Sequence, residues 1–187
     1  YIIEGKDRDN FKNSGILPNK KIAPFRQLPV LDVDGKIFAQ TGAIARFCGK
    51  LSGLYPKDDD LAAARIDQVI EVAQDINYLF TLSSRDKEKE KLKLARKILA
   101  TKHLPKYFNF LENLIKENDN SLFFVGENIS IADLAIWRLL GWFESGIIDG
   151  VPTNILEPYE NLKKMRNEIY KHPKVNDWMI KTYGKVI

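Results

Sequence analysis

The sequence predicts an α/β segment over residues 1–55 followed by an all-helical bundle over residues 56–187. Short apolar runs separated by prolines and glycines fill the first part, whereas apolar residues recur at helical spacing through most of the second. A chain of 187 residues with 44% hydrophobic and 29% charged residues has the composition of a globular protein of one or two small domains. This composition excludes a disordered chain and a coiled-coil rod.

A β-hairpin is predicted between two short apolar runs, residues 30–33 and 36–38. Asp34 and Gly35 separate these runs, and this dipeptide favours the positive φ angles of a two-residue hairpin turn.

A helix is predicted directly after the hairpin, with the Thr41 hydroxyl as its N-cap. Cys48 falls on the apolar face of this helix with Ile44 and Leu51, so we expect a buried structural thiol.

The second part begins after a linker at residues 55–60 and contains long amphipathic helices. The predicted helical segments are 61–80, 92–115, 131–143, 158–170 and 173–183. Pro105 should kink the second segment. The third is apolar on every face and should form the buried centre of the bundle, with Ser130 as N-cap and Asp133 completing a capping box.

Charge and cysteine content limit the partners. The net charge of +4 comes from residues 85–97, which hold seven basic and three acidic residues, so the rest of the chain is neutral and a nucleic-acid-coating protein is not expected. One cysteine cannot form an intramolecular disulfide, and two distant histidines provide no zinc motif. The best apolar run, residues 129–143, carries Asp133 and Arg138 and is too short for a membrane helix. We expect a cytoplasmic protein without metal, nucleic-acid or membrane partners.

The most informative stretch runs from Pro24 to Phe47. A bend or a cis bond at Leu28-Pro29 would leave the backbone N–H and C=O of Leu28 available to pair with a peptide-like ligand. Twelve residues later, Gln40-Thr41 lies where a strand leads into a helix, and a helix N-terminus favours a carboxylate. The motif predicts a site for a short peptide with a free carboxylate; the alternative for Gln40-Thr41 is an ordinary helix cap.

These residues resemble the cytosolic glutathione S-transferases, nearest the sigma-like class. The family pattern is Pro-Phe-x-Gln-(Leu/Met/Val)-Pro-(Val/Ile)-Leu, an Asp-Gly hairpin, and Gln-Ser-x-Ala-Ile-x-Arg-(Tyr/Phe) at the same spacing. Ser130-Ile131-Ala132-Asp133-Leu134-Ala135 matches the family's capping box, so the resemblance covers the whole chain. It implies that residues 1–55 form a thioredoxin-like, glutathione-binding domain and that residues 56–187 form the helical domain.

The resemblance also implies the roles of individual residues. Leu28 would pair with the cysteinyl unit of glutathione, Gln40 and Thr41 would hold the γ-glutamyl carboxylate, and Asp75 would reach the γ-glutamyl amine of the neighbouring subunit in a homodimer. Lys20 or Lys21 would approach the glycyl carboxylate. The implied glutathione-binding set is Gln27, Leu28, Gln40, Thr41, Lys20, Lys21 and Asp75.

Departures from the family pattern are also visible. Arg26 replaces the usual glycine before the glutamine, and Phe11 stands where many relatives have tryptophan. Glu71 and Gln74 occupy positions that are aspartates in metal-stimulated relatives, so no metal is predicted.

The catalytic residue expected from the resemblance is a tyrosine on the first strand, which would stabilise the glutathione thiolate. Residues 1–4 align with the second strand, so we expect a strand and a helix of roughly 25 residues to precede Tyr1. The alternative is a naturally truncated, inactive homologue.

The function implied by the resemblance is conjugation of glutathione, as co-substrate, to small apolar electrophiles, a detoxifying transferase activity. The helical domain would supply the acceptor pocket. The alternative is a non-catalytic binding or scaffold protein with the same fold, which would bind glutathione or a partner protein without turnover.

Overall fold

The computed structural model describes residues 5–118 and 121–184, and these divide into two compact units after Gly53. Within these ranges no helix is long and apolar enough to cross a membrane.

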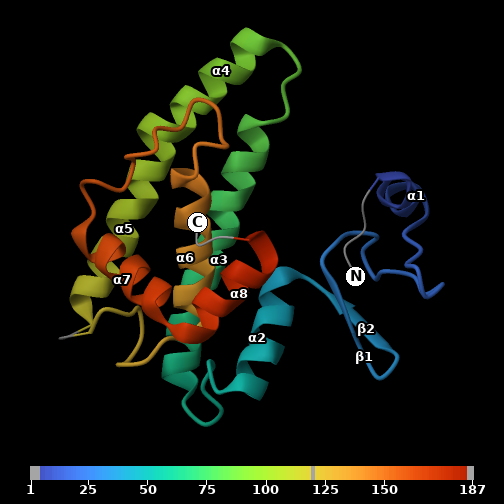
Figure 1. Cartoon of the computed structure of the whole chain (residues 1–187), viewed down its shortest axis with the longest axis horizontal. Helices are drawn as coiled ribbons and strands as arrows, with labels where there is room; N and C mark the ends of the chain where they lie inside the picture. The colour runs from blue at the N-terminus through green and yellow to red at the C-terminus, as the bar shows by residue number, and fades with distance from the viewer. Residues whose placement is uncertain (1–4, 119–120, 185–187) are drawn as a thin grey trace. The chain divides into compact units, whose positions relative to one another are not determined.

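The first unit contains two helices and a two-stranded antiparallel sheet. Its elements are α1 (Gly5–Ser14), β1 (Val30–Val33), β2 (Lys36–Ala39) and α2 (Thr41–Ser52) (Figure 1). Asp34 and Gly35 have φ angles of 49° and 86°, the left-handed conformation that the two-residue turn requires, so the hairpin is confirmed.

The core of the first unit lies under the hairpin. Phe11, Leu17 and Ala23 are buried together, and Val30 and Ile37 pack against them. The α2 helix contacts both strands. The Phe38 and Phe47 rings meet edge to face with centroids 5.2 Å apart, a favourable aromatic geometry.

The expected burial of Cys48 is wrong. Helix α2 buries Gly42 and Gly49, whereas Cys48 and Leu51 are exposed. The apolar spacing identified a helix, but the small glycines occupy its buried face.

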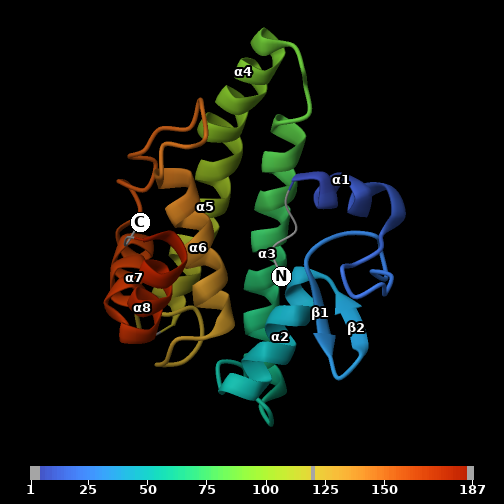
Figure 2. The ribbon, with the colours of Figure 1, turned by 45° about the vertical axis from the view of Figure 1, so that its right-hand side comes forward.

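The second unit is a helical bundle. Its elements are α3 (Asp60–Ser83), α4 (Lys89–Ile98), the π-helical segment η1 (Leu99–His103), α5 (Leu104–Glu117), α6 (Ile131–Glu144), α7 (Glu160–Lys171) and α8 (Pro173–Tyr183). Helix α6 contacts α3 and α7, and α7 also contacts α5 and α8 (Figures 1 and 2). Eight of the fourteen α6 residues are buried, which confirms α6 as the centre of the bundle.

The helix before Pro105 widens into η1, where the N–H of Leu104 donates to the carbonyl of Leu99, five residues earlier. A proline ring clashes with the carbonyl four residues before it, and a wider turn is a known way to accommodate this clash. The predicted disturbance at Pro105 therefore takes the form of a π segment.

The capping box of α6 is confirmed. Ser130 Oγ accepts from the N–H of Ala132 at 3.2 Å, and Asp133 Oδ2 accepts from the N–H of Ser130 at 2.8 Å. Asp133 Oδ1 also accepts from the N–H of Phe124 at 2.8 Å. One buried carboxylate thus fixes both the start of α6 and the loop that leads to it.

The start of the second unit differs from the predicted linker. Tyr55 is buried, and its hydroxyl donates to Asp67 Oδ1 at 3.0 Å. This residue therefore belongs to the helical unit, because it packs beside the first turns of α3.

Candidate functional site

The hairpin register places Leu28-Pro29 opposite Gln40-Thr41. Val30 pairs with Ala39, so continuing the antiparallel register by one residue puts Pro29 across from Gln40. The Leu28–Pro29 peptide bond is cis, one of the two geometries expected from the sequence. Two motifs twelve residues apart thus both lie next to the last pair of the hairpin, at its open end.

Leu28 is positioned to offer its backbone to a ligand. Its side chain and neighbouring residues lie on the surface, with Leu28 45% exposed. In the part of the chain that the structure describes, neither the N–H nor the C=O of Leu28 has a hydrogen-bond partner. An extended peptide could pair with both groups as a short strand does.

The start of α2 differs from expectation by one residue. Gln40, not Thr41, is the N-cap, and it has φ 76° and ψ 120° and makes no side-chain cap hydrogen bond. Thr41 is the first helical residue and is exposed. An uncapped first turn leaves backbone N–H groups without intrahelical partners, and the helix dipole adds positive potential there. A carboxylate suits this position.

The two lysines lie in a turn that is held to the hairpin. The N–H of Leu17 donates to the carbonyl of Lys21 at 2.8 Å, and Lys20 in between has φ 64°. Lys21 Nζ lies 3.1 Å from Asp32 Oδ2 and 3.0 Å from the carbonyl oxygen of Gly35. The Lys21 ammonium is therefore beside the turn of the hairpin, whereas Leu28 lies at its open end.

The remaining predicted residues are exposed. Gln27 lies beside Leu28 in the same loop, and Asp75 lies on α3 in the helical unit. The structure thus brings Gln27, Leu28, Gln40 and Thr41 into one region of the first unit, and places Lys21 elsewhere in that unit. The roles of all these residues stay predictions.

Two residues of this region were not assigned a role from the sequence. Asp32 gathers three donors, because its carboxylate also accepts from Asn19 Nδ2 at 3.0 Å and from the N–H of Gly35 at 2.9 Å. Arg26 has φ 50°, the left-handed region that favours glycine. The usual glycine at this position in the family pattern was the available signal for that conformation.

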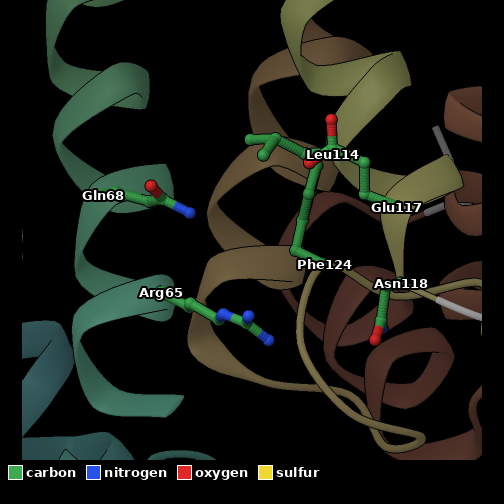
Figure 3. A pocket seen from close by; sticks show the side chains of 6 residues that line it. All are labelled: Arg65, Gln68, Leu114, Glu117, Asn118 and Phe124. Carbon is green, nitrogen blue, oxygen red and sulfur yellow. The ribbon is translucent and has the colours of Figure 1, made fainter. Parts of the chain in front are cut away.

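A small cavity lies in the helical unit, with a volume of about 110 Å³. Arg65 and Gln68 project from α3 toward Leu114 and Glu117 of α5, with Asn118 and Phe124 completing the lining (Figure 3). Four of these six side chains are polar, so this cavity does not match the apolar acceptor pocket expected from the resemblance.

No site for a metal was predicted. Within residues 5–118 and 121–184, no three His, Cys, Asp or Glu side chains are grouped as a metal ion would require.

The fold and this site define a protein with a thioredoxin-like segment and a helical domain, and comparison with known proteins identifies its family. Residues 74–182 match the model of the glutathione S-transferase C-terminal domain. Glutathione S-transferase 1 of Ascaris suum is 30% identical over 166 residues, which cover 86% of this chain and 76% of that protein. This chain belongs to the glutathione S-transferase family.

Two further similarities agree with this assignment. The glutathione S-transferase of Plasmodium yoelii yoelii is 33% identical over 141 residues, covering 75% of this chain but 64% of that protein. The structure of prostaglandin synthase D of Nilaparvata lugens matches with a TM-score of 0.80 and 26% identity, over 96% of this chain and 82% of that chain. The fold expected from the sequence is confirmed, while the sigma-like class stays a prediction.

Proposed function

We propose that this protein conjugates the thiol of glutathione to small apolar electrophiles. The observation that carries the proposal is that Leu28-Pro29 and Gln40-Thr41 both lie at the open end of the hairpin, next to its last pair. A backbone edge and a helix N-terminus at this spacing suit a peptide that ends in a carboxylate. Relatives that carry the name glutathione S-transferase support the same reaction.

In this reaction the described residues bind and orient glutathione. Leu28 pairs with the backbone of the cysteinyl unit, which holds the thiol in a fixed position. Gln40 and the first turn of α2 hold the γ-glutamyl carboxylate, and the Thr41 hydroxyl donates to it. The electrophile binds against the helical domain.

We propose that two copies form a homodimer in which Asp75 reaches the γ-glutamyl amine bound to the other subunit. Asp75, Tyr78 and Leu82 are spaced by three and four residues on α3, so they share one helical face. All three are exposed, and an exposed apolar pair beside a carboxylate supports an interface.

The first test is glutathione binding and conjugation of an aryl halide by the wild type, Thr41→Val and Thr41→Ser. The valine variant keeps the side-chain shape but loses the hydroxyl donor to a charged group, so glutathione should bind roughly tenfold more weakly. Thr41→Ser should bind within about twofold of wild type, because the hydroxyl remains.

The outcomes separate the candidate functions. Binding with turnover supports the transferase. Binding without turnover, in protein shown to carry a preceding strand, favours the non-catalytic glutathione-binding alternative. Equal affinity of the wild type and Thr41→Val would contradict the role given to Thr41.

A further inference from the structure

Arg26 has an unfavourable backbone conformation beside the proposed ligand loop. Its φ of 50° lies in the left-handed region, which is unfavourable for a non-glycine residue, and such residues concentrate at functional sites. Arg26 stands two residues before Leu28, so their Cα atoms are at most about 7 Å apart. A glycine here would avoid the cost, which raises the question of what the arginine side chain contributes.

The stem of Arg26 is held in place by a second special residue. A Cβ atom on Gly15 would lie 2.5 Å from Arg26 Cγ and 3.0 Å from Arg26 Cβ, so only glycine leaves room for the arginine. Gly15 is itself at φ 71°, and its carbonyl accepts from the N–H of Ala23 at 2.9 Å. The N–H of Arg26 in turn donates to the carbonyl of Ala23 at 3.0 Å.

The guanidinium of Arg26 is exposed and is not used within the described part of the fold. Among the side chains of residues 9–118 and 121–184 and the described backbone, it has no hydrogen-bond, ion-pair or aromatic partner. The aliphatic part of the Arg26 side chain packs against Gly15, and the five guanidinium N–H donors have no partner among the described residues. Such a group can bind a carboxylate through two parallel hydrogen bonds.

The competing lysines are less suitably placed. Lys21 already contacts Asp32, which lies two residues further along β1 than Val30, or roughly 7 Å further from Leu28 along the strand. To reach a ligand at Leu28, Lys21 would have to give up Asp32 and the carbonyl of Gly35. Lys20 lies in the turn that these contacts hold beside the hairpin.

We propose that Arg26 binds the second carboxylate of the ligand, the glycyl carboxylate of glutathione, and so determines specificity for a peptide ending at that position. This proposal rests on the proposed function, since it takes glutathione as the peptide held at Leu28. Arg26 then does what the family resemblance assigned to Lys20 or Lys21.

The test compares two ligands on three forms of the protein. Glutathione and γ-glutamylcysteine, which lacks the glycyl unit, are titrated by calorimetry into the wild type, Arg26→Gly and Lys20→Gly. Both variants remove one positive charge and replace a non-glycine residue at positive φ, so Lys20→Gly is a matched control. Glycine suits both backbones, so the unfolding midpoint of either variant should not fall.

Arg26→Gly should weaken glutathione binding roughly tenfold or more, the effect of losing a hydrogen-bonded charge pair, and change γ-glutamylcysteine binding less than twofold. Lys20→Gly should bind both ligands nearly as the wild type does. Arg26→Lys should recover part of the lost affinity, because the charge returns without the planar fork.

Selective loss of glutathione in Lys20→Gly but not in Arg26→Gly would overturn the proposal and leave the proposed function standing. Equal weakening of both ligands by Arg26→Gly would also overturn it, since the arginine would then act on the loop and not on the glycyl carboxylate. A wild type that binds neither ligand would overturn the proposed function together with this inference.

Discussion

Glu144 of α6 and Arg166 of α7 form an ion pair, and the pKa of Glu144 is raised above its ordinary value. Arg166 Nε and Glu144 Oε2 are 3.0 Å apart and mostly buried, but the two atoms do not have hydrogen-bond geometry. Burial raises the pKa of Glu144 above its ordinary value of 4.5, and the charges of Arg166 and Lys163 only partly offset this. Desolvation therefore outweighs attraction.

A raised native pKa means that the folded protein keeps this proton to a higher pH than the unfolded chain does. The contribution of Glu144 to the free energy of unfolding is therefore greatest below pH 4.5 and falls as the pH rises through the native pKa. Residue 144 does not titrate in Glu144→Gln, so the stability of the wild type relative to this variant should fall as the pH rises above about 4.5. Urea unfolding at several pH values measures this.

Glu160→Gln is the matched control, since Glu160 is exposed and pairs with Lys164, which is also exposed. The stability of the wild type relative to this variant should vary little with pH. A stability advantage of the wild type over Glu144→Gln that grows with pH would contradict the prediction.

Among single residues, the sequence predicted those side-chain contacts whose two partners are close along the chain. Asp133 was predicted to cap α6 because its partner Ser130 is three residues away. The pairing of Lys21 with Asp32 depends on how a loop folds back on the hairpin, and no local spacing encodes it. The positive φ of Arg26 was not predicted, although the glycine in the family pattern was an available signal for it, and no local spacing indicated the contact with Gly15.

Helix α7 begins without a cap from its own sequence, and α5 supplies one. The Glu112 carboxylate accepts from the N–H of Asn161 at 3.1 Å, from Asn161 Nδ2 at 2.8 Å and from the N–H of Leu162 at 3.0 Å. Tyr159, the N-cap residue, makes no side-chain cap hydrogen bond but donates its hydroxyl to the carbonyl of Pro105 at 3.3 Å. Two contacts from the α5 end of the bundle thus fix the start of α7.

Glu112→Ala should lower the free energy of unfolding by about 2 kcal/mol, because it leaves several donors at a helix N-terminus without an acceptor. Glu117→Ala, an exposed glutamate on the same helix, is the control and should change it by less than about 0.5 kcal/mol. Chemical denaturation followed by circular dichroism measures both. Similar losses in the two variants would show that α5 helicity, not capping of α7, is responsible.

Elements with a strong apolar period were predicted well, and elements defined by distant contacts were not. Helix α3 was predicted at residues 61–80 and extends over Asp60–Ser83, and α6 was found nearly residue for residue. Helix α1 was not predicted, because only Phe11 among its residues 9–14 is buried and the segment has no apolar stripe. Apolar residues recur at helical spacing where one face of a helix is buried, so a helix that buries few side chains has no such pattern in its sequence.

The whole molecule consists of two units of very different core size. The first buries a three-residue apolar cluster, whereas the second buries an extensive set of aliphatic and aromatic side chains around α6. The sequence predicted two domains that meet near residue 55. Prolines and glycines typical of turns are frequent before this point, and apolar residues recur at helical spacing after it. The candidate site lies in the unit with the smaller apolar cluster, where backbone groups at a strand end and a helix end remain available to a ligand.

The proposed homodimer makes a prediction at the level of assembly. Leu94 and Ile98 are one helical turn apart on α4 and are 58% and 42% exposed, and α4 contacts α3, which carries the exposed Tyr78 and Leu82. Burying these side chains against a second copy removes apolar surface from water, which favours association. We expect sedimentation equilibrium to give twice the mass of one chain, and Leu94→Glu with Ile98→Glu to shift the protein toward the single-chain mass.

Ile147→Glu provides the control, because Ile147 is even more exposed, at 76%, but lies in the loop after α6. It should leave the mass doubled, since an exposed apolar residue outside an interface contributes little to association. A wild type with the mass of a single chain would contradict the dimer. Equal dissociation by Ile147→Glu and by the α4 variant would show that added charge, and not loss of the apolar α4 face, separates the two copies. The α4 face would then not support the homodimer in which Asp75 is proposed to act.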